Sequence, residues 1–184
     1  MTKRILAFGA SNSKHSINKK FAAFAANKLE NAEVNLIDMN DYELPLYSVD
    51  LQTSNGIHQN AMRFAEKIKQ SDAIIISLAE YNGLHTSAFK NLWDWLSRIP
   101  SETQWNIWKN KPMLLLSASP SKRPVNNVIK VSKQLFPHFG ANIIADFYLP
   151  SFHHFFDNNR ITKPKYKEEF EIAFKKFQDY LKST

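Results

Sequence analysis

Short apolar runs alternate with segments of helical periodicity along this chain, and this alternation limits the possible folds more than any other feature. The runs at residues 5–8 and 73–78 are almost continuously apolar, as are strands that a parallel sheet buries on both faces. The sequence therefore predicts five strands, at Ile5–Phe8, Val34–Ile37, Ala73–Leu78, Met113–Leu116 and Ile143–Leu149.

Helical segments lie between and after these runs. Their apolar stripes recur at the spacing of one helix face, over residues 17–29, 57–68, 92–96, 128–135 and 166–181. This order predicts an α/β fold with right-handed crossovers, namely a doubly wound five-stranded parallel sheet of order 2-1-3-4-5 with helices on both faces. Without a repeat or linker, residues 1–184 are expected to form a single domain.

Composition excludes several classes of function. The chain has no cysteine, so disulfides, thiolate nucleophiles and cysteine-bound zinc are excluded, and a redox function must use a cofactor. The first apolar run is too short for a signal peptide or membrane span, which predicts a cytoplasmic protein without a membrane partner. The net charge is +7, but the basic residues are spread along the chain, so we expect a solvated surface and no nucleic-acid partner.

Ligands of such sheets bind beyond the carboxyl ends of the strands, so the segments after the first, third and fourth predicted strands form the candidate site. The first segment, residues 9–18, is rich in hydroxyls, amides and cations. A helix N-terminus supplies free N–H groups, and Ser11, Ser13 and Ser16 add hydroxyl donors, with Ser16 as the expected N-cap. The spacing matches neither a dinucleotide fingerprint nor a Walker loop, which favours a mononucleotide phosphate.

Lys19 and Lys20 fall in the first turn of the predicted helix, where a cation opposes the helix dipole. A bound dianion would remove that cost. The alternative is an ordinary capped polar turn without a ligand.

The segment after the third strand reads Glu80-Tyr81-Asn82-Gly83 and continues with L-H-T-S-A-F-K-N-L-W-D-W at residues 84–95. It resembles the NAD(P)H-dependent FMN reductase family of flavodoxin-like proteins, whose members show a P-E-Y-N-G turn after the third strand and L-K-N-x-x-D-W at the next helix. The serine-rich segment is similar to the phosphate loop of that family, G-S-x-R-x-x-S-x-N. A tight turn at Gly83 would bring backbone groups and the Tyr81 face close to a planar ring.

The resemblance implies a flavodoxin-like fold, FMN as cofactor, and NADPH or NADH as co-substrate. It also implies a ping-pong reaction that reduces a small acceptor such as a flavin, a quinone, an azo compound or a metal ion. Because FMN would carry the chemistry, we predict neither a catalytic side chain nor a bound metal. The predicted cofactor-binding residues are Ser11, Ser13, Ser16, Ile17, Asn18, Glu80, Tyr81, Asn82, Gly83, Ser117, Ser119 and Pro120.

The sequence departs from the family pattern at several positions. Ala10 and Ser13 stand where the family has glycine and arginine, and Ala79 stands where it has proline, although Lys14 adjoins the missing arginine. The segment 117–124 lacks the glycine that family members carry beside the flavin ring. Rival interpretations are therefore a flavodoxin-type electron carrier, which the positive charge opposes, and a phosphate-binding protein that has lost flavin.

Three further features have open interpretations. Lys122 and Arg123 could contact the extra phosphate of NADPH or belong to a solvated loop. The adjacent His153 and His154 lack further ligands at metal spacing, which favours a loop over the site or a subunit contact. The family often forms dimers or tetramers, so we expect a homodimer or homotetramer. The tryptophans Trp93, Trp95, Trp105 and Trp108 could belong to the core or to this interface, and we expect them to be exposed at the interface.

Overall fold

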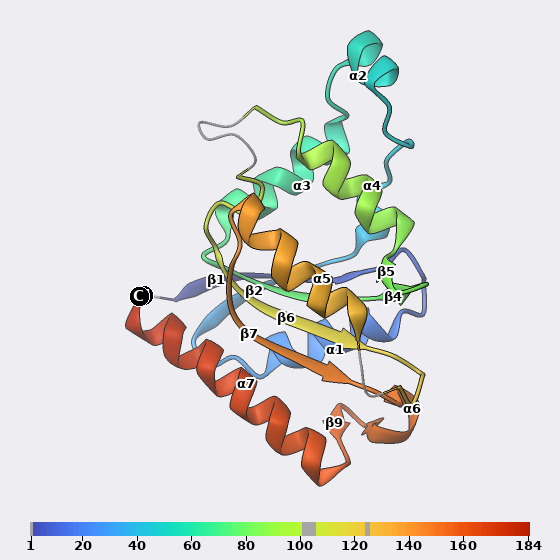
Figure 1. Ribbon diagram of the computed structural model, residues 1–184. Coiled ribbons are helices and arrows are strands. Elements are labelled where there is room, and N and C mark those ends of the chain that lie inside the picture. Colours follow the sequence, from blue (N-terminus) through green and yellow to red (C-terminus); the bar gives the residue numbers. More distant parts are fainter. Residues whose placement is uncertain (1, 101–105, 124–125) are drawn as a thin grey trace.

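The computed structural model describes residues 2–100, 106–123 and 126–184, and Figure 1 shows a central sheet between two layers of helices. All neighbouring strands of the sheet are parallel, in the order β2-β1-β3-β6-β7. Along the chain, β1, β2, β3, β6 and β7 are the first to fifth strands of this sheet. Their order in space is therefore 2-1-3-4-5, and the predicted order is confirmed. The strands are β1 (Lys3–Ala10), β2 (Ala32–Ile37), β3 (Ala73–Leu78), β6 (Pro112–Ala118) and β7 (Asn142–Leu149).

Helices cover both faces of the sheet, as predicted (Figure 1). One face packs against α1 (Ile17–Asn27) and α7 (Pro164–Ser183). The other face packs against α3 (Gln59–Gln70), α4 (Ser87–Leu96) and α5 (Asn127–Leu135).

Alternation along the central strands explains why both faces are apolar. Phe8 of β1 points to the α3/α4 side and meets Phe64 with ring centroids 5.2 Å apart, whereas its neighbour Ala7 belongs to the opposite core. On that opposite side Phe21 of α1 lies 5.9 Å from Phe170 of α7. A strand covered on both sides has no solvent face for polar residues, which is why β1 and β3 read as continuous apolar runs.

Several short elements were not predicted from the sequence. Two are helices, α2 (Val49–Asn55) and α6 (Phe152–Phe155), and two are 3-10 turns, η1 (Met39–Tyr42) and η2 (Phe136–Phe139). Two small hairpins are formed by β4 (Glu80–Tyr81) with β5 (Leu84–His85), and by β8 (Phe156–Asp157) with β9 (Arg160–Ile161). Helix α2 projects from the body of the molecule and buries none of its residues (Figure 1). Of the helices in the described ranges, none has both the length and the apolar character needed to cross a membrane.

The expectation of exposed tryptophans at a subunit interface is wrong for three of the four. Trp93, Trp95 and Trp108 are buried in the monomer. Trp95 donates its indole N–H to the Pro45 carbonyl at 2.8 Å, and Trp93 packs edge-on against the aromatic rings of η2. The core beneath α4 is large enough to take these rings. Trp105 lies outside the described residues.

Candidate functional site

The predicted site segments lie at one edge of the sheet. β1, β3 and β6 are parallel neighbours, so the chain leaves all three at their shared carboxyl edge. A direct contact joins the first two segments, because the Thr86 hydroxyl donates to the Ala10 carbonyl at 3.2 Å. The residue that follows the Tyr81-Asn82-Gly83 hairpin strands is therefore bonded to the residue that precedes the serine-rich turn, at the edge where doubly wound sheets bind ligands.

The turn after β1 folds tightly against the start of α1. Ser16 is the N-cap, as predicted, and its hydroxyl accepts the Lys19 N–H at 3.4 Å. The buried Ser11 hydroxyl accepts the Ser13 N–H at 3.1 Å. Gly9 is required here, since a Cβ at this position would lie 2.5 Å from the Lys19 nitrogen. The missing side chain thus lets the strand end approach the helix start.

The donors that this turn presents to solvent suit a phosphate. Asn12, Ser13 and Lys14 have exposed side chains, and the backbone N–H groups of Ile17 and the next residue belong to the first helical turn, which has no intrahelical acceptor. Hydroxyl, amide and ammonium donors around a helix N-terminus form the kind of donor set that binds a terminal phosphate. The residues present therefore fit a mononucleotide without the arginine of the family pattern.

Lys19 has a partner that the sequence did not reveal. Its ammonium forms an ion pair with Asp38 at the end of β2 and also donates to the Ser13 carbonyl at 3.4 Å. Partial burial opposes ionisation of Asp38, but hydrogen bonds from Lys19 and Asn40 lower the pKa of the carboxyl below its usual value. A bound anion is thus not needed to offset the Lys19 charge, and that part of the argument for a phosphate loses its force.

Asn18 connects the start of α1 to two strands, β6 and β3. Its buried amide donates to the Ala118 carbonyl at 3.0 Å, and its oxygen accepts the Ala118 N–H at 2.8 Å and the Ser77 hydroxyl at 2.7 Å. Both polar atoms of the buried side chain bond to β6 or β3, so the group that we assign toward a ligand is the backbone N–H of Asn18. Its contribution is to hold the turn after β1 against the two neighbouring strands.

The turn after β3 is the tight hairpin expected from its sequence. Asn82 and Gly83 have φ angles of 53° and 85°, in the left-handed region that two-residue hairpin turns require. Tyr81 is 52% exposed and presents its ring to solvent. The Glu80 carboxylate is engaged elsewhere, because it accepts the Val128 N–H at 2.9 Å in the first turn of α5.

The segment after β6 is fixed without glycine. The buried Ser117 hydroxyl donates to the Leu78 carbonyl at 2.7 Å and accepts from the Asn126 amide at 2.9 Å. The Ser119 N–H donates to the Leu149 carbonyl at 3.1 Å, which ties the segment to the end of β7. Pro120, Lys122 and Arg123 are exposed, and Pro124 lies outside the described residues.

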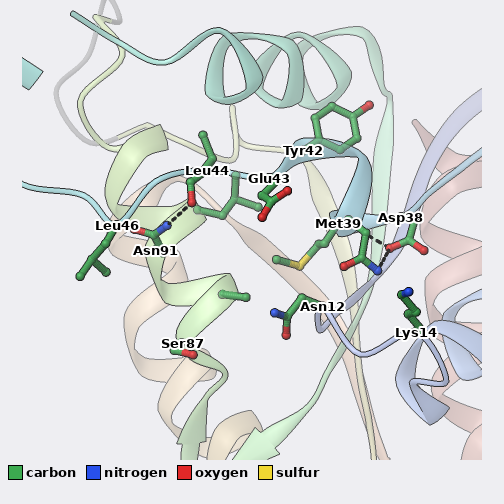
Figure 2. A pocket seen from close by; sticks show the side chains of 13 residues that line it. Asn12, Lys14, Asp38, Met39, Tyr42, Glu43, Leu44, Leu46, Ser87 and Asn91 are labelled. Atoms are coloured by element: carbon green, nitrogen blue, oxygen red, sulfur yellow. Dashed lines mark hydrogen bonds between the residues drawn. The ribbon is translucent and has the colours of Figure 1, made fainter. Parts of the chain in front are cut away.

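A cavity of about 620 Å³ opens beside the serine-rich turn (Figure 2). It lies between that turn, the segment after β2 and the first turns of α4. Asn12 and Lys14 face it from one side and Ser87 and Asn91 from another, while Asp38 to Leu46 form the remaining wall. None of the twelve predicted cofactor-binding residues lines this cavity.

The wall formed by residues 38–46 was missed because the candidate segments were restricted to those after the first, third and fourth strands. The rule that ligands bind at the carboxyl edge applies equally to the segment after β2. Lys14 and Asn12, which line the cavity, do belong to the serine-rich turn that the sequence singled out. The signal that could have revealed the wall was thus the position of Asp38 directly after a predicted strand.

Comparison with known proteins gives matches over most of the chain. The family model described as NADPH-dependent FMN reductase matches residues 3–154. The chain is 35% identical over 77 residues to a quinone reductase of Escherichia coli (strain K12), a match that covers 42% of this chain and 39% of that protein. It is 27% identical over 147 residues to the uncharacterized protein MG342 homolog of Mycoplasma pneumoniae, covering 79% of this chain and 86% of the relative.

Solved structures confirm the predicted flavodoxin-like fold. FerB from Paracoccus denitrificans, a flavoenzyme NAD(P)H:(acceptor) oxidoreductase, superposes with a TM-score of 0.77 at 23% identity and 98% coverage of both chains. An azoreductase from Bacillus anthracis str. Sterne gives a TM-score of 0.60 at 18% identity, covering 96% of this chain and 99% of that chain. At these identities the similarity concerns the fold.

Proposed function

This chain belongs to the NADPH-dependent FMN reductase family, and we propose that it is an oxidoreductase that takes electrons from NADPH or NADH through FMN and gives them to a small acceptor. Flavins, quinones and azo compounds are the acceptor classes that we propose. The observation that carries the proposal is a hydrogen bond of 3.2 Å between the two candidate segments. Thr86, directly after the hairpin strands, donates its hydroxyl to the carbonyl of Ala10, directly before the serine-rich turn.

The phosphate would be held at the start of α1. Exposed Ser13 supplies a hydroxyl, Ile17 and Asn18 supply backbone N–H groups, and Ser11 and Ser16 keep the turn folded. Lys14 would provide the positive charge that the family places one position earlier.

The ring would rest between the hairpin and the segment after β6. Tyr81 offers an exposed aromatic face, and Asn82 and Gly83 offer backbone groups, with no side chain at Gly83 to hinder close approach. Ser119 and Pro120 form the opposite wall. Glu80 and Ser117 would support these walls without contacting the ring, since the Glu80 side chain bonds to α5 and the Ser117 side chain bonds to β3.

When bound, FMN supplies hydride acceptance and electron donation. The chain itself has to hold the ring, leave one face open to the nicotinamide and the acceptor, and limit access of water. None of these tasks needs a titrating side chain at the ring, so we assign neither a catalytic residue nor a metal.

We also propose that residues 1–184 act as one domain and associate as a homodimer or homotetramer. The two cores share a single sheet, which supports one folding unit. Exposed Leu84 and Leu135 on the α4/α5 side offer apolar surface for association. Sedimentation equilibrium would give the mass directly, and a monomer at all concentrations would contradict the proposed assembly.

An anaerobic absorbance titration tests the activity. Purified protein is mixed with FMN, desalted, and then titrated with NADPH or NADH, with protein-free FMN as control. We expect a yellow protein whose flavin absorbance bleaches on addition of reduced nicotinamide and returns when a quinone is added. A protein that is colourless after desalting, or a coloured one that neither nicotinamide bleaches, would refute the proposal.

A further inference from the structure

The hairpin that carries Tyr81 to Gly83 is fastened to α5 at two points, one helical turn apart. At one, the Glu80 carboxylate accepts the Val128 N–H at 2.9 Å. At the other, the Nε2 atom of His85 lies 2.7 Å from the Ser132 hydroxyl oxygen. Glu80 and His85 are themselves partners in the β4/β5 ladder, so both strands of the hairpin are tied to the same helix.

Hydrogen-bond counting assigns the proton between His85 and Ser132. The Ser132 hydroxyl has one proton and donates it to the Val128 carbonyl at 2.7 Å. It must therefore accept at the His85 contact, which places the imidazole proton on Nε2. Burial, with a smaller contribution from the Lys90 charge, lowers the pKa of His85 to about 4, so the neutral form is the one present near neutral pH.

Aromatic rings fix the orientation of this imidazole. It stacks on Phe136 with ring centroids 5.7 Å apart and an interplanar angle of 14°, and it meets Trp93 edge-on at 5.5 Å. Phe89 closes a third side at 5.4 Å. A ring held on three sides can direct its N–H only toward Ser132, so the contact works as a rigid connection.

The same helix is also tied to the end of β6, at Ser117, two residues before Ser119. Asn126 caps α5 by accepting the Ile129 N–H at 3.0 Å, and its amide donates to the Ser117 hydroxyl at 2.9 Å. α5 is therefore fastened both to the hairpin and to the end of the strand that leads into the other proposed wall. Its attachment to the hairpin fixes one wall relative to the other.

From this arrangement we infer that His85 and Ser132 are positioning residues that set the separation of the two flavin-binding walls without touching the flavin. The inference rests on the proposed function, because it presumes that FMN binds between these walls. A preformed slot does not have to be ordered by the ligand, and this raises affinity. Loss of the connection should therefore weaken FMN binding by folded protein, by about 3- to 10-fold for one hydrogen bond.

Two single variants test the connection from its two ends. His85→Phe keeps an aromatic ring for stacking but removes the donor, and Ser132→Ala removes the acceptor. FMN dissociation constants are measured by quenching of flavin fluorescence, under conditions where circular dichroism shows each variant to be folded. Ser97→Ala is the control, because this hydroxyl at the C-cap of α4 likewise donates to a carbonyl of the preceding helical turn, that of Asp94 at 2.7 Å, and this bond does not involve the hairpin.

We expect each single variant to bind FMN about 3- to 10-fold more weakly than wild type. The double variant should bind no more weakly than the more affected single variant, because both substitutions remove the same contact. The control should bind as wild type does. A merely structural role would lower the stability of the variants and leave the dissociation constant of the folded protein unchanged, which would overturn the inference. Wild-type protein that fails to bind FMN would instead refute the proposed function.

Nitrogen NMR of the wild-type imidazole gives an independent readout, which holds even if His85→Phe does not fold. We expect the chemical shifts of a neutral ring with the proton on Nε2 and none on Nδ1. A ring protonated on Nδ1, or one that averages between the two forms, would overturn the inference because Ser132 would then lack its donor.

Discussion

Burial of the His85 ring among Phe89, Trp93 and Phe136 makes its charge state part of the stability of the protein. Its pKa is about 4 in the folded chain, against an ordinary value of 6.5. Between these values the unfolded chain binds a proton that the folded chain does not bind. The stabilisation is complete above pH 6.5 and is lost as the pH falls toward 4.

We therefore predict that the free energy of unfolding falls by about 1 to 3 kcal/mol between pH 6.5 and 4 because of His85 alone. Urea unfolding of wild type and His85→Phe at several pH values measures this as a difference. Acidic groups such as Asp38 and Asp72 titrate in both proteins, so their contributions cancel. Equal pH dependence of the two proteins would contradict the prediction.

A second prediction at the scale of one residue concerns Gly9. In Gly9→Ala the new Cβ would lie 2.5 Å from the Lys19 nitrogen and 2.7 Å from its Cα, which are backbone atoms that cannot move aside. We expect a loss of about 2 to 4 kcal/mol of stability, together with weaker FMN binding as the turn is displaced.

Gly56→Ala is the comparison for this change. Gly56 has a φ of 74° but no atom within 4 Å of a built Cβ, so alanine there adds backbone strain without a clash. Thermal unfolding should show a loss nearer 1 kcal/mol and no change in FMN binding. A Gly9→Ala protein as stable as Gly56→Ala would show that the strand end and helix start can separate.

At the scale of elements, α4 carries F-K-N-L-W-D-W at residues 89–95, the counterpart of the family motif L-K-N-x-x-D-W, and this segment holds the chain after β2. Asn91 accepts the Tyr47 N–H at 2.8 Å and donates to the Pro45 carbonyl at 3.0 Å, and Trp95 donates to the same carbonyl. Lys90 forms an exposed ion pair with Asp94 at 2.6 Å. These contacts anchor α4 to the chain after β2.

Removing the side-chain amide of Asn91 should loosen the chain after β2, including α2, while the rest of the fold stays intact. In Asn91→Ala we expect faster amide hydrogen exchange over residues 44–56, including α2, which buries none of its residues. Global stability should fall by about 1 to 2 kcal/mol. Lys90→Ala is the control, since an exposed pair contributes less than about 1 kcal/mol. Unchanged exchange in this segment would mean that other contacts hold it.

At the scale of the whole molecule, the carboxyl edge of the sheet is cross-linked by buried polar side chains. Asn18 joins the start of α1 to β6 and β3, Ser117 joins β6 to β3, and Thr86 joins the turn after β3 to β1. These bonds occur where three strands end, away from the apolar cores. They make the proposed site one rigid unit.

Asn18→Ala should therefore destabilise the entire domain. It leaves the Ala118 N–H and carbonyl and the Ser77 hydroxyl without their partner in a buried place, for which we expect a cost of about 2 to 4 kcal/mol in urea unfolding. Asn35→Ala on the edge strand β2 is the control, because that side chain is exposed. A loss below about 0.5 kcal/mol would show that water replaces the amide.

Much of this architecture follows from the pattern of residues alone. The five strands and the five long helices arise from local periodicity, and their alternation indicates a parallel sheet, for which 2-1-3-4-5 is a common order of five strands. The turn at Asn82 and Gly83 also follows locally, since few residue pairs adopt that conformation. By contrast, α2 and α6 are short, and their few residues leave no periodic signal.

The sequence by itself determined the fold, the family and the two segments that leave the same edge of the sheet, because periodicity, turn chemistry and motif order are local properties. Only the tertiary structure decided how the polar side chains of those segments are used. Asn18 bonds to a residue 100 positions away, Glu80 to one 48 positions away and His85 to one 47 positions away. Spacing along the chain cannot reveal such partners, since they meet only after the strands pair and the helices pack.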